Sequence, residues 1–353
     1  MADHGPMTTG GDLSQGFFER AARPIIEDVL SCAGYLAARL GSGSDVLGFD
    51  DHRSRDHDFG CRLTVLVDDE HQSQLGALDE ELEAQLPSEV DGWPTRFATT
   101  WDATISHKVD VHTVHDFAAG RLGFDLRARP SAAQWLCLTG QSILEVTGGP
   151  VFHDGTRSYS EVCNTLRWYP DDLWYYVLAA GWTRLGQELP FVGRTGELDD
   201  EASSRIIASR LCRDIGHLAF VVERTWMPYP KWQGTALRQL PNGPAIEALL
   251  IAVQASTEWT VRQRLLEEAI ETLVEQHREA GFDLPTPVIH TFFDRPFITT
   301  SEEIPLFFLD QVVDQGIRAF PLVGSIEQWC DNVDLLSQPR QRATALALYQ
   351  TAR

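Results

Sequence analysis

The chain has 353 residues, enough to bury two hydrophobic cores, and its 43% hydrophobic and 23% charged residues are typical of globular proteins. Asp and Glu number 51 against 29 Lys and Arg, and the formal net charge of -22 disfavours broad binding to nucleic acids. The sequence lacks both a secretion leader and any apolar stretch of about 18 residues, and it therefore predicts a cytoplasmic protein without membrane partners. Six scattered cysteines without a CxxC pair predict reduced thiols rather than a zinc knuckle or a disulfide framework.

Residues 14–130 are predicted to form a small mixed sheet with helices packed against it. Five segments follow the periodicity of buried secondary structure. In chain order they are a helix at Ser14–Leu40, a strand at Cys61–Val67, a helix at Glu70–Leu86, and strands at Arg96–Thr100 and Lys108–Val114. The alternation of helices and strands within a short segment is typical of an α+β domain.

The pattern changes after Pro130, where helices dominate. Seven segments are predicted to be helices, and several of them carry apolar stripes that are wide enough for a helical bundle. They are Ser131–Leu138, Ser158–Tyr169, Pro170–Gln187, Glu201–Trp226, Gly234–Leu240, Pro244–Ala255 and Glu258–Ala280. We therefore predict an α+β protein with one domain at residues 14–130 and a helical domain at residues 131–353, which ends in an irregular C-terminal extension.

Three aspartates form the candidate catalytic site. Asp56 and Asp58 lie two positions apart just before the strand at 61–67, so an extended backbone would point both carboxylates to one face. Asp110 lies inside the run KVDVHTV, where a charged side chain is costly to bury unless it is paired or binds a metal. Carboxylate oxygens are the ligands that Mg²⁺ prefers, so we predict that these three residues bind two Mg²⁺ ions against a triphosphate.

A glycine-serine turn precedes the first two aspartates. Gly43 and Ser44 lie in a segment whose backbone amides can remain unpaired and whose glycines permit close approach of a phosphate. Arg53 and Arg55 lie between this turn and the aspartates, and are predicted to contact the same triphosphate. Two histidines, His112 and His115, offer zinc as an alternative metal, but no cysteine lies at ligand spacing.

The segment MPYPKW, Met227–Trp232, is a second candidate for nucleotide binding. Its two prolines restrict the backbone to an extended turn after a long helix. A rigid loop of this kind would present Lys231 to a phosphate and Tyr229 to a base. The alternative is a solvated lysine beside a structural corner, and the sequence does not separate the two.

These segments together resemble a known family. The Gly43-Ser44 pair, the spaced Asp56 and Asp58, and the strand-borne Asp110 are similar to the active-site signature of the DNA polymerase β-like nucleotidyltransferase superfamily. The resemblance to one bacterial family, DUF4037, is carried by the runs GSDVLGFDDHRSRDHDFG, VFHDG, WYPDDLWYY, FVGRTGELDDEASSRI and MPYPKW. It implies a nucleotidyltransferase domain followed by a helical domain, and it implies no particular acceptor.

The predicted reaction transfers a nucleoside monophosphate, most simply AMP from ATP, to a hydroxyl or amine of a small-molecule acceptor and releases pyrophosphate. Two Mg²⁺ ions and ATP or another nucleoside triphosphate are the expected cofactor and substrate. Two alternatives remain at this point: a non-catalytic nucleotide-binding module that keeps the fold, and an enzyme that transfers AMP to a protein.

Overall fold

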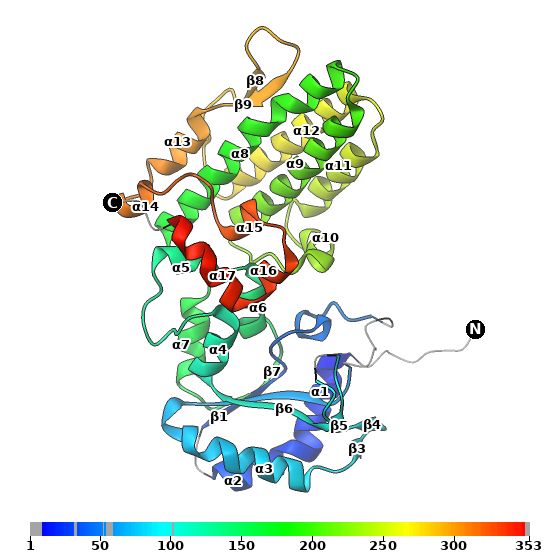
Figure 1. The fold of residues 1–353 in the computed structure, drawn as a ribbon, viewed down its shortest axis with the longest axis vertical. Coiled ribbons are helices and arrows are strands. Elements are labelled where there is room, and N and C mark those ends of the chain that lie inside the picture. Colours follow the sequence, from blue (N-terminus) through cyan, green and yellow to red (C-terminus); the bar gives the residue numbers. More distant parts are fainter. Residues whose placement is uncertain (1–8, 32–33, 52, 54–58, 101, 350–353) are drawn as a thin grey trace, which may run out of the picture. The chain divides into compact units, whose positions relative to one another are not determined.

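The computed structural model describes residues 9–31, 34–51, 53, 59–100 and 102–349 (Figure 1). The chain divides into two compact units. The sheet unit consists of Met1–Pro130 and Ser142–Arg167, and the helical unit consists of Ser131–Gln141 and Trp168–Arg353. A small mixed sheet in one unit and packed helices in the other confirm the predicted α+β class.

A five-stranded sheet in the order β5-β6-β2-β1-β7 forms the centre of the sheet unit. Its strands are β1 (Tyr35–Ala38), β2 (Arg62–Val67), β5 (Arg96–Phe97), β6 (Ser106–Thr113) and β7 (Val151–Asp154). Strands β2 and β6 run parallel, whereas the β1–β2, β1–β7 and β5–β6 pairs are antiparallel. A separate two-stranded ribbon joins β3 (Glu89–Val90) to β4 (Trp93–Pro94). The predicted strands at 61–67 and 108–114 are therefore confirmed.

One face of the sheet lies against α2 (Arg23–Leu30) and α3 (Leu75–Gln85), which follows the 3-10 helix η3 (Asp69–Gln74). Buried apolar side chains fill this layer, among them Leu63, Val65 and Val109 from the strands and Leu78 and Leu82 from α3. The opposite side of the sheet carries α4 (Val114–Leu122) and α7 (Ser158–Thr165), as Figure 1 shows. Because side chains alternate along a strand, every second residue of β2 and β6 points away from the apolar layer.

The predicted helix at Ser14–Leu40 is wrong at its C-terminal end. The observed segment consists of α1 (Gly10–Phe17), a π-helical turn η1 (Phe18–Ala22) and α2, which ends at Leu30. Residues Tyr35–Ala38 instead form β1, and all four are buried because β2 and β7 pair with both edges of the strand. These non-local hydrogen bonds outweigh the helix propensity of Leu and Ala. The Gly-Ser turn therefore follows a strand rather than a helix.

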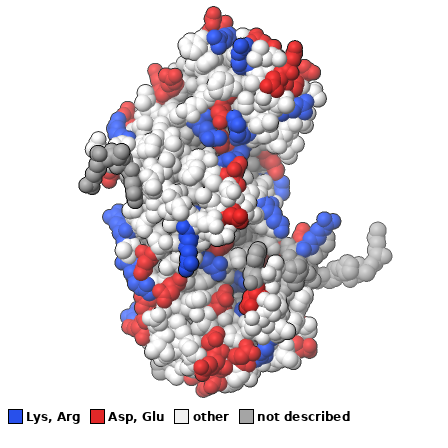
Figure 2. Space-filling model, in the orientation of Figure 1, with Lys and Arg blue, Asp and Glu red and all other residues white. Residues whose placement is uncertain are grey.

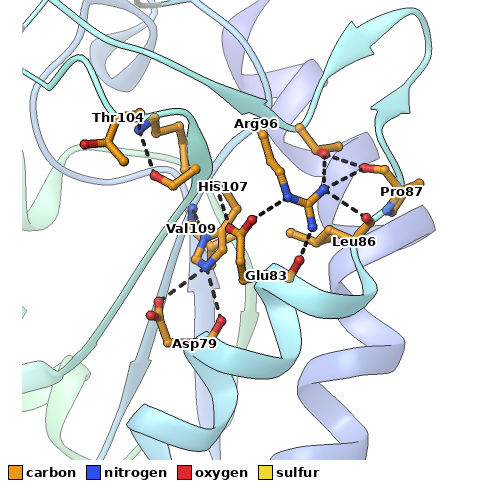
Figure 3. A network of polar contacts seen from close by, with 11 residues as sticks. Asp79, Glu83, Leu86, Pro87, Arg96, Thr104, His107 and Val109 are labelled. Carbon is orange, nitrogen blue, oxygen red and sulfur yellow. Dashed lines mark hydrogen bonds and ion pairs between the residues drawn. The ribbon is translucent and has the colours of Figure 1, made fainter.

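A polar network fixes the edge of the sheet that contains β6 (Figure 3). Arg96 on β5 donates to a carboxylate oxygen of Glu83 (2.8 Å) and to the carbonyl of Leu86 (3.0 Å), at the C-terminal end of α3. The other carboxylate oxygen of Glu83 accepts from the backbone N–H of His107 at 3.1 Å. A cation at a helix C-terminus also interacts favourably with the helix dipole. This network anchors the first half of β6 to α3.

The helical unit is built around long helices that pack side by side. Its main elements are α8 (Asp171–Glu197), α9 (Glu201–Val222), α11 (Gly243–Ala255) and α12 (Trp259–Glu279). At Gly196 of α8 an added Cβ would overlap the Trp259 side chain, so the glycine permits close approach of α12. Shorter elements complete the unit. These are α5 (Ala132–Leu136), η4 (Pro230–Trp232), α10 (Gln233–Leu237), β8 (Ile289–Thr291), β9 (Ile298–Thr300), α13 (Glu303–Leu309), α14 (Gln315–Arg318), α15 (Ile326–Trp329), α16 (Val333–Ser337), α17 (Pro339–Arg342) and η5 (Ala343–Tyr349).

Residues 142–167 belong to the sheet unit, although the sequence places them in a helical domain that begins at residue 131. The physical reason is that β7 pairs with β1 as an edge strand of the sheet. Helix α6 (Gly140–Thr147) begins in the last residues of the helical unit's first segment and continues into the sheet unit.

Acidic side chains gather on one part of the surface of the sheet unit. Figure 2 shows acidic side chains over α2 and α3, where Glu27, Asp28, Asp79, Glu80 and Glu81 are exposed. Within the described residues no helix is both long enough and apolar enough to cross a membrane.

Candidate functional site

Asp110 lies in the middle of β6, directly across from Thr64 of β2 in the parallel register. Its neighbour Val109 points into the apolar layer, so the Asp110 side chain points to the opposite face of the sheet. The carboxylate is half-buried, and among the residues that the structure describes it has no hydrogen-bond donor and no cationic partner. A carboxylate held by a central strand without a partner costs stability, and such a group is available for a metal ion.

The Gly-Ser turn lies beside the same pair of strands. The Thr64 hydroxyl accepts from the Leu40 amide at 3.3 Å and lies 3.4 Å from the Leu40 carbonyl, which holds the chain beyond β1 against β2. The turn begins immediately afterwards at Gly41, and the 3-10 helix η2 (Ser44–Leu47) follows it. The turn that contains Gly43 and Ser44 therefore follows directly on a residue that contacts β2, the strand paired with β6.

The backbone of this turn exposes amide donors. The N–H groups of Ser42, Gly43 and Ser44 donate no hydrogen bond to any described residue. Ser42 and Gly43 are exposed and Ser44 is half-buried, so these donors are accessible to a ligand. Gly43 has a φ of 143°, and an added Cβ would come within 2.7 Å of Arg39 Nη2, so glycine is required here.

The buried Arg39 side chain fixes the conformation of the turn. The sequence did not indicate this role for Arg39. Its guanidinium pairs with both carboxylate oxygens of Asp45, at 2.7 and 3.0 Å, and donates to the carbonyls of Leu40 (2.6 Å) and Ser42 (2.9 Å). Only 2% of the Arg39 side chain is exposed. In a trans peptide the C=O and the following N–H point in opposite directions, so the inward carbonyl of Ser42 turns the Gly43 amide outward.

A second arginine outside the predicted set reaches the same turn. Arg121 of α4 has an ion pair with Glu145 of α6, with 3.4 Å between Nη1 and Oε2. The backbone carbonyl of Glu145 accepts from the Gly41 amide at 2.7 Å. An added Cβ at Gly41, whose φ is 89°, would lie 3.0 Å from Arg121 Nη2. The guanidinium thus occupies space next to the turn, in a position that no local sequence pattern could have indicated.

Three predicted residues, Arg55, Asp56 and Asp58, lie outside the described residues, so their part in the site stays a prediction. The described residues contain no group of three His, Cys, Asp or Glu side chains that could hold a metal ion. His112 and His115 therefore belong to no such group among the described residues. His112 is exposed, and His115 contacts Asp69, with 3.2 Å between Nδ1 and Oδ2.

Three buried cysteines have raised thiol pKa values. Burial raises the pKa of the Cys61 thiol to about 11, and it does the same for Cys137. Burial raises the pKa of the Cys212 thiol to about 12. These groups are protonated at neutral pH, and a thiol nucleophile acts as the thiolate.

The predicted nucleotide-binding residues Tyr229 and Lys231 lie in the helical unit. The Tyr229 amide donates to Gln141 Oε1 at 2.9 Å, and an added Cβ at Gly140 would come within 2.7 Å of the Met227 amide nitrogen. The segment is therefore packed tightly against the start of α6. Lys231 is exposed, and its Nζ lies 4.7 Å from the ring centroid of Trp232.

An aromatic cluster precedes this segment and holds it. The Trp226 ring lies 4.3 Å from the Trp168 ring and 4.7 Å from the Tyr169 ring, measured between centroids. The Trp135 ring lies 6.5 Å from the Trp226 ring, with an interplanar angle of 7°. Trp135, Trp168 and Tyr169 are buried, so the cluster is part of the core of the helical unit.

Comparison with known proteins gives one family match. The family described as "Domain of unknown function (DUF4037)" matches residues 135–233, a segment that includes β7, the helices α8 and α9, and the Met227–Trp232 loop. None of the curated proteins matches this chain. One solved structure, titled as a nucleotidyltransferase-like protein from Exiguobacterium sibiricum 255-15, covers 74% of this chain and 78% of its own at 12% identity and a TM-score of 0.35. Similarity at that level carries no argument about the site. The resemblance to the DUF4037 family is confirmed by the match over residues 135–233.

Proposed function

We propose that this chain is a magnesium-dependent nucleotidyltransferase. The acceptor's oxygen or nitrogen would bond to the α-phosphorus of a nucleoside triphosphate, most simply ATP. The bond between the α- and β-phosphates would break, and pyrophosphate would leave with its electron pair. The observation that carries the proposal is the Asp110 carboxylate, which has no partner among the described residues. Strand β2, which pairs with the strand of Asp110, also contacts Leu40 before a turn whose amides donate to no described residue.

The residues at this site fit the groups that the reaction requires. Asp110 offers a hard oxygen ligand that no described residue neutralises, and Asp56 and Asp58 would complete the ligand set for two Mg²⁺ ions. When bound, such ions would neutralise charge on the transferring phosphate and on the leaving pyrophosphate. The amides of Gly43 and Ser44 would bind the β- and γ-phosphates, and Arg55 would contact the nucleotide.

The charge of the chain bears on the acceptor. With a formal net charge of -22, the protein would attract a cationic small molecule and repel a polyanion. We therefore propose a small-molecule hydroxyl or amine as the acceptor rather than DNA or RNA. Amine-containing acceptors of the aminoglycoside kind fit this preference, although net charge alone does not select one of them.

Calorimetric titration tests the binding step. ATP with Mg²⁺ is titrated into the wild type and into the double variant Asp56→Asn/Asp58→Asn, with EDTA as a control and the other three nucleoside triphosphates in parallel. We expect magnesium-dependent binding that the double variant loses. Equal binding by both proteins, or binding by neither, would contradict the assignment of these carboxylates.

Pyrophosphate release tests the transfer step. The wild type is incubated with Mg²⁺, ATP and a panel of amines and alcohols, and released pyrophosphate is measured enzymatically. Magnesium-dependent binding without pyrophosphate from any acceptor would favour a non-catalytic nucleotide-binding module. Label from the α-phosphate of ATP appearing on a protein would instead favour transfer to protein.

A further inference from the structure

We propose that Arg121 is the residue that binds the terminal phosphates of the nucleoside triphosphate, and that Glu145 holds it beside the Gly41–Ser44 turn. The proposal rests on the proposed function and assigns its triphosphate specificity to one side chain. "Terminal phosphates" here means the β- and γ-phosphates, which a nucleoside monophosphate lacks.

Glu145 joins the turn and the arginine in one arrangement. Its backbone carbonyl accepts from the Gly41 amide at 2.7 Å, and its carboxylate lies 3.4 Å from Arg121 Nη1. On the α4 side, the Arg121 guanidinium lies 5.3 Å from the ring centroid of Phe117, within the range of a cation–π interaction. Glu145 and Phe117 therefore both contact the guanidinium, and Glu145 also binds the turn.

The two arginines at this turn differ in exposure and in the length of their contacts with a carboxylate. Arg39 is 2% exposed and has two short contacts with Asp45, at 2.7 and 3.0 Å, which is the geometry of a permanent bidentate pair. Arg121 is 30% exposed, and its 3.4 Å contact with Glu145 is longer than the about 2.7–2.9 Å of a strong charge-assisted bond. The guanidinium of Arg121 is therefore more accessible to a ligand than that of Arg39.

The position of the Arg121 guanidinium suits a phosphate. It lies 3.0 Å from the point that a Cβ of residue 41 would occupy, and the chain leaves this space to it by placing glycine there. The amides of Ser42, Gly43 and Ser44, which donate to no residue in the described part of the chain, follow within three positions. Backbone N–H groups and a planar guanidinium are both donors that match phosphate oxygens.

Titration calorimetry with Mg-ATP and with AMP tests the proposal on three variants. Arg121→Gln removes the charge, Arg121→Lys keeps a charge but not the planar donor pair, and Arg129→Gln removes a charge elsewhere. Arg129 is a suitable control because it is exposed and has no hydrogen bond or ion pair with another described residue. The melting temperature of each variant is measured without ligand to confirm that it is folded.

We expect Arg121→Gln to weaken Mg-ATP binding roughly tenfold to a hundredfold, the typical effect of losing a hydrogen bond to a charged group. AMP binding should change by less than about twofold, because AMP has no terminal phosphates. Arg121→Lys should give an intermediate loss, and Arg129→Gln none. A purely structural role would reduce both affinities together and leave their ratio unchanged.

The possible failures are distinguishable. If the wild type binds Mg-ATP and Arg121→Gln keeps the wild-type ratio of ATP to AMP affinity, this inference is wrong and the proposed function stands. If the wild type does not bind Mg-ATP, the proposed function fails and the inference fails with it. If Arg121→Gln does not fold, the same ratio measured on Arg121→Lys decides the question.

Discussion

Replacing Asp110 with Asn should affect stability and ligand binding in opposite directions. Without ligand, the wild-type carboxylate is half-buried and has no partner among the described residues, so it contributes little and costs desolvation. Asn has nearly the same size and no charge. We therefore expect Asp110→Asn to leave the free energy of unfolding unchanged or to raise it by up to about 1 kcal/mol.

Asp68 provides the matched control, because it lies at the end of β2 and its carboxylate is fully partnered. It accepts from the amides of Arg157 and Ser158, both at 3.0 Å, and from the Ser158 hydroxyl at 2.5 Å. Burial opposes its ionisation, but these hydrogen bonds outweigh burial and lower the pKa of Asp68. We expect Asp68→Asn to cost about 1–3 kcal/mol, since it leaves buried donors without a charged acceptor.

Adding Mg-ATP should reverse which of the two aspartate variants is less stable relative to the wild type. At a Mg-ATP concentration one hundred times its Kd, binding stabilises the wild type by about 2.7 kcal/mol. In a unit of this size each kcal/mol shifts the melting temperature by roughly 2–4 °C, so the wild type should gain about 5–11 °C. Asp68→Asn should keep that gain, and Asp110→Asn should lose it.

Differential scanning fluorimetry and urea unfolding, each with and without Mg-ATP, measure both effects. The reasoning would be refuted if Asp110→Asn destabilised the ligand-free protein as much as Asp68→Asn does, because Asp110 would then have a structural role. It would also be refuted if Asp110→Asn retained the full stabilisation by Mg-ATP.

Two further predictions concern packing and pH. Gly140→Ala should lower the free energy of unfolding by about 1–3 kcal/mol, because the new Cβ would overlap the Met227 backbone. The control Gly216→Ala in α9 would create only ordinary van der Waals contacts and should be neutral or stabilising. Urea unfolding of both variants measures these effects. The hydrogen bond from Arg127 is the main cause that lowers the pKa of Asp69 to about 2. The ionised Asp69 carboxylate therefore stabilises the folded state above the ordinary carboxylate pKa of about 4, and this stabilisation is lost as the pH falls towards 2. Because the Asp69 side chain is 38% exposed, solvent screening keeps this stabilisation small. Arg127→Gln should flatten the dependence of the urea midpoint on pH between 4 and 2. An unchanged slope would contradict the assignment of the lowered pKa to Arg127.

Much of the architecture could be predicted from local patterns. The strand β6 carries alternating Val and polar residues, and the long helices of the helical unit carry apolar stripes with clear ends. Strand β1 could not be predicted in this way. Its residues, Tyr35–Ala38, are all buried and show no alternation, and Leu and Ala favour a helix. What makes the segment a strand is its pairing with β2 and with β7, which lies more than 110 residues away in the sequence.

The same distinction applies to the site. Asp110 could be selected because a charged residue inside a β-run is unusual, and Gly43 because glycine allows a tight turn. The roles of Arg39 and Arg121 depend on contacts that only the folded chain creates. In particular, Glu145 reaches the turn from α6, a segment that the sequence assigns to the helical domain.

The overall charge and the local charge at the site favour different molecules. ATP is highly anionic and the chain has a formal charge of -22, so binding must rely on groups close to the phosphates. At physiological ionic strength charges are screened beyond about 8 Å, so acidic side chains farther away than this oppose binding only weakly. Within that distance, the backbone amides of the turn, Arg121 and the bound Mg²⁺ would supply positive charge. At longer range the net negative charge would raise the encounter rate of a cationic acceptor and lower that of an anionic one. This difference makes amine-containing small molecules the first acceptors to test.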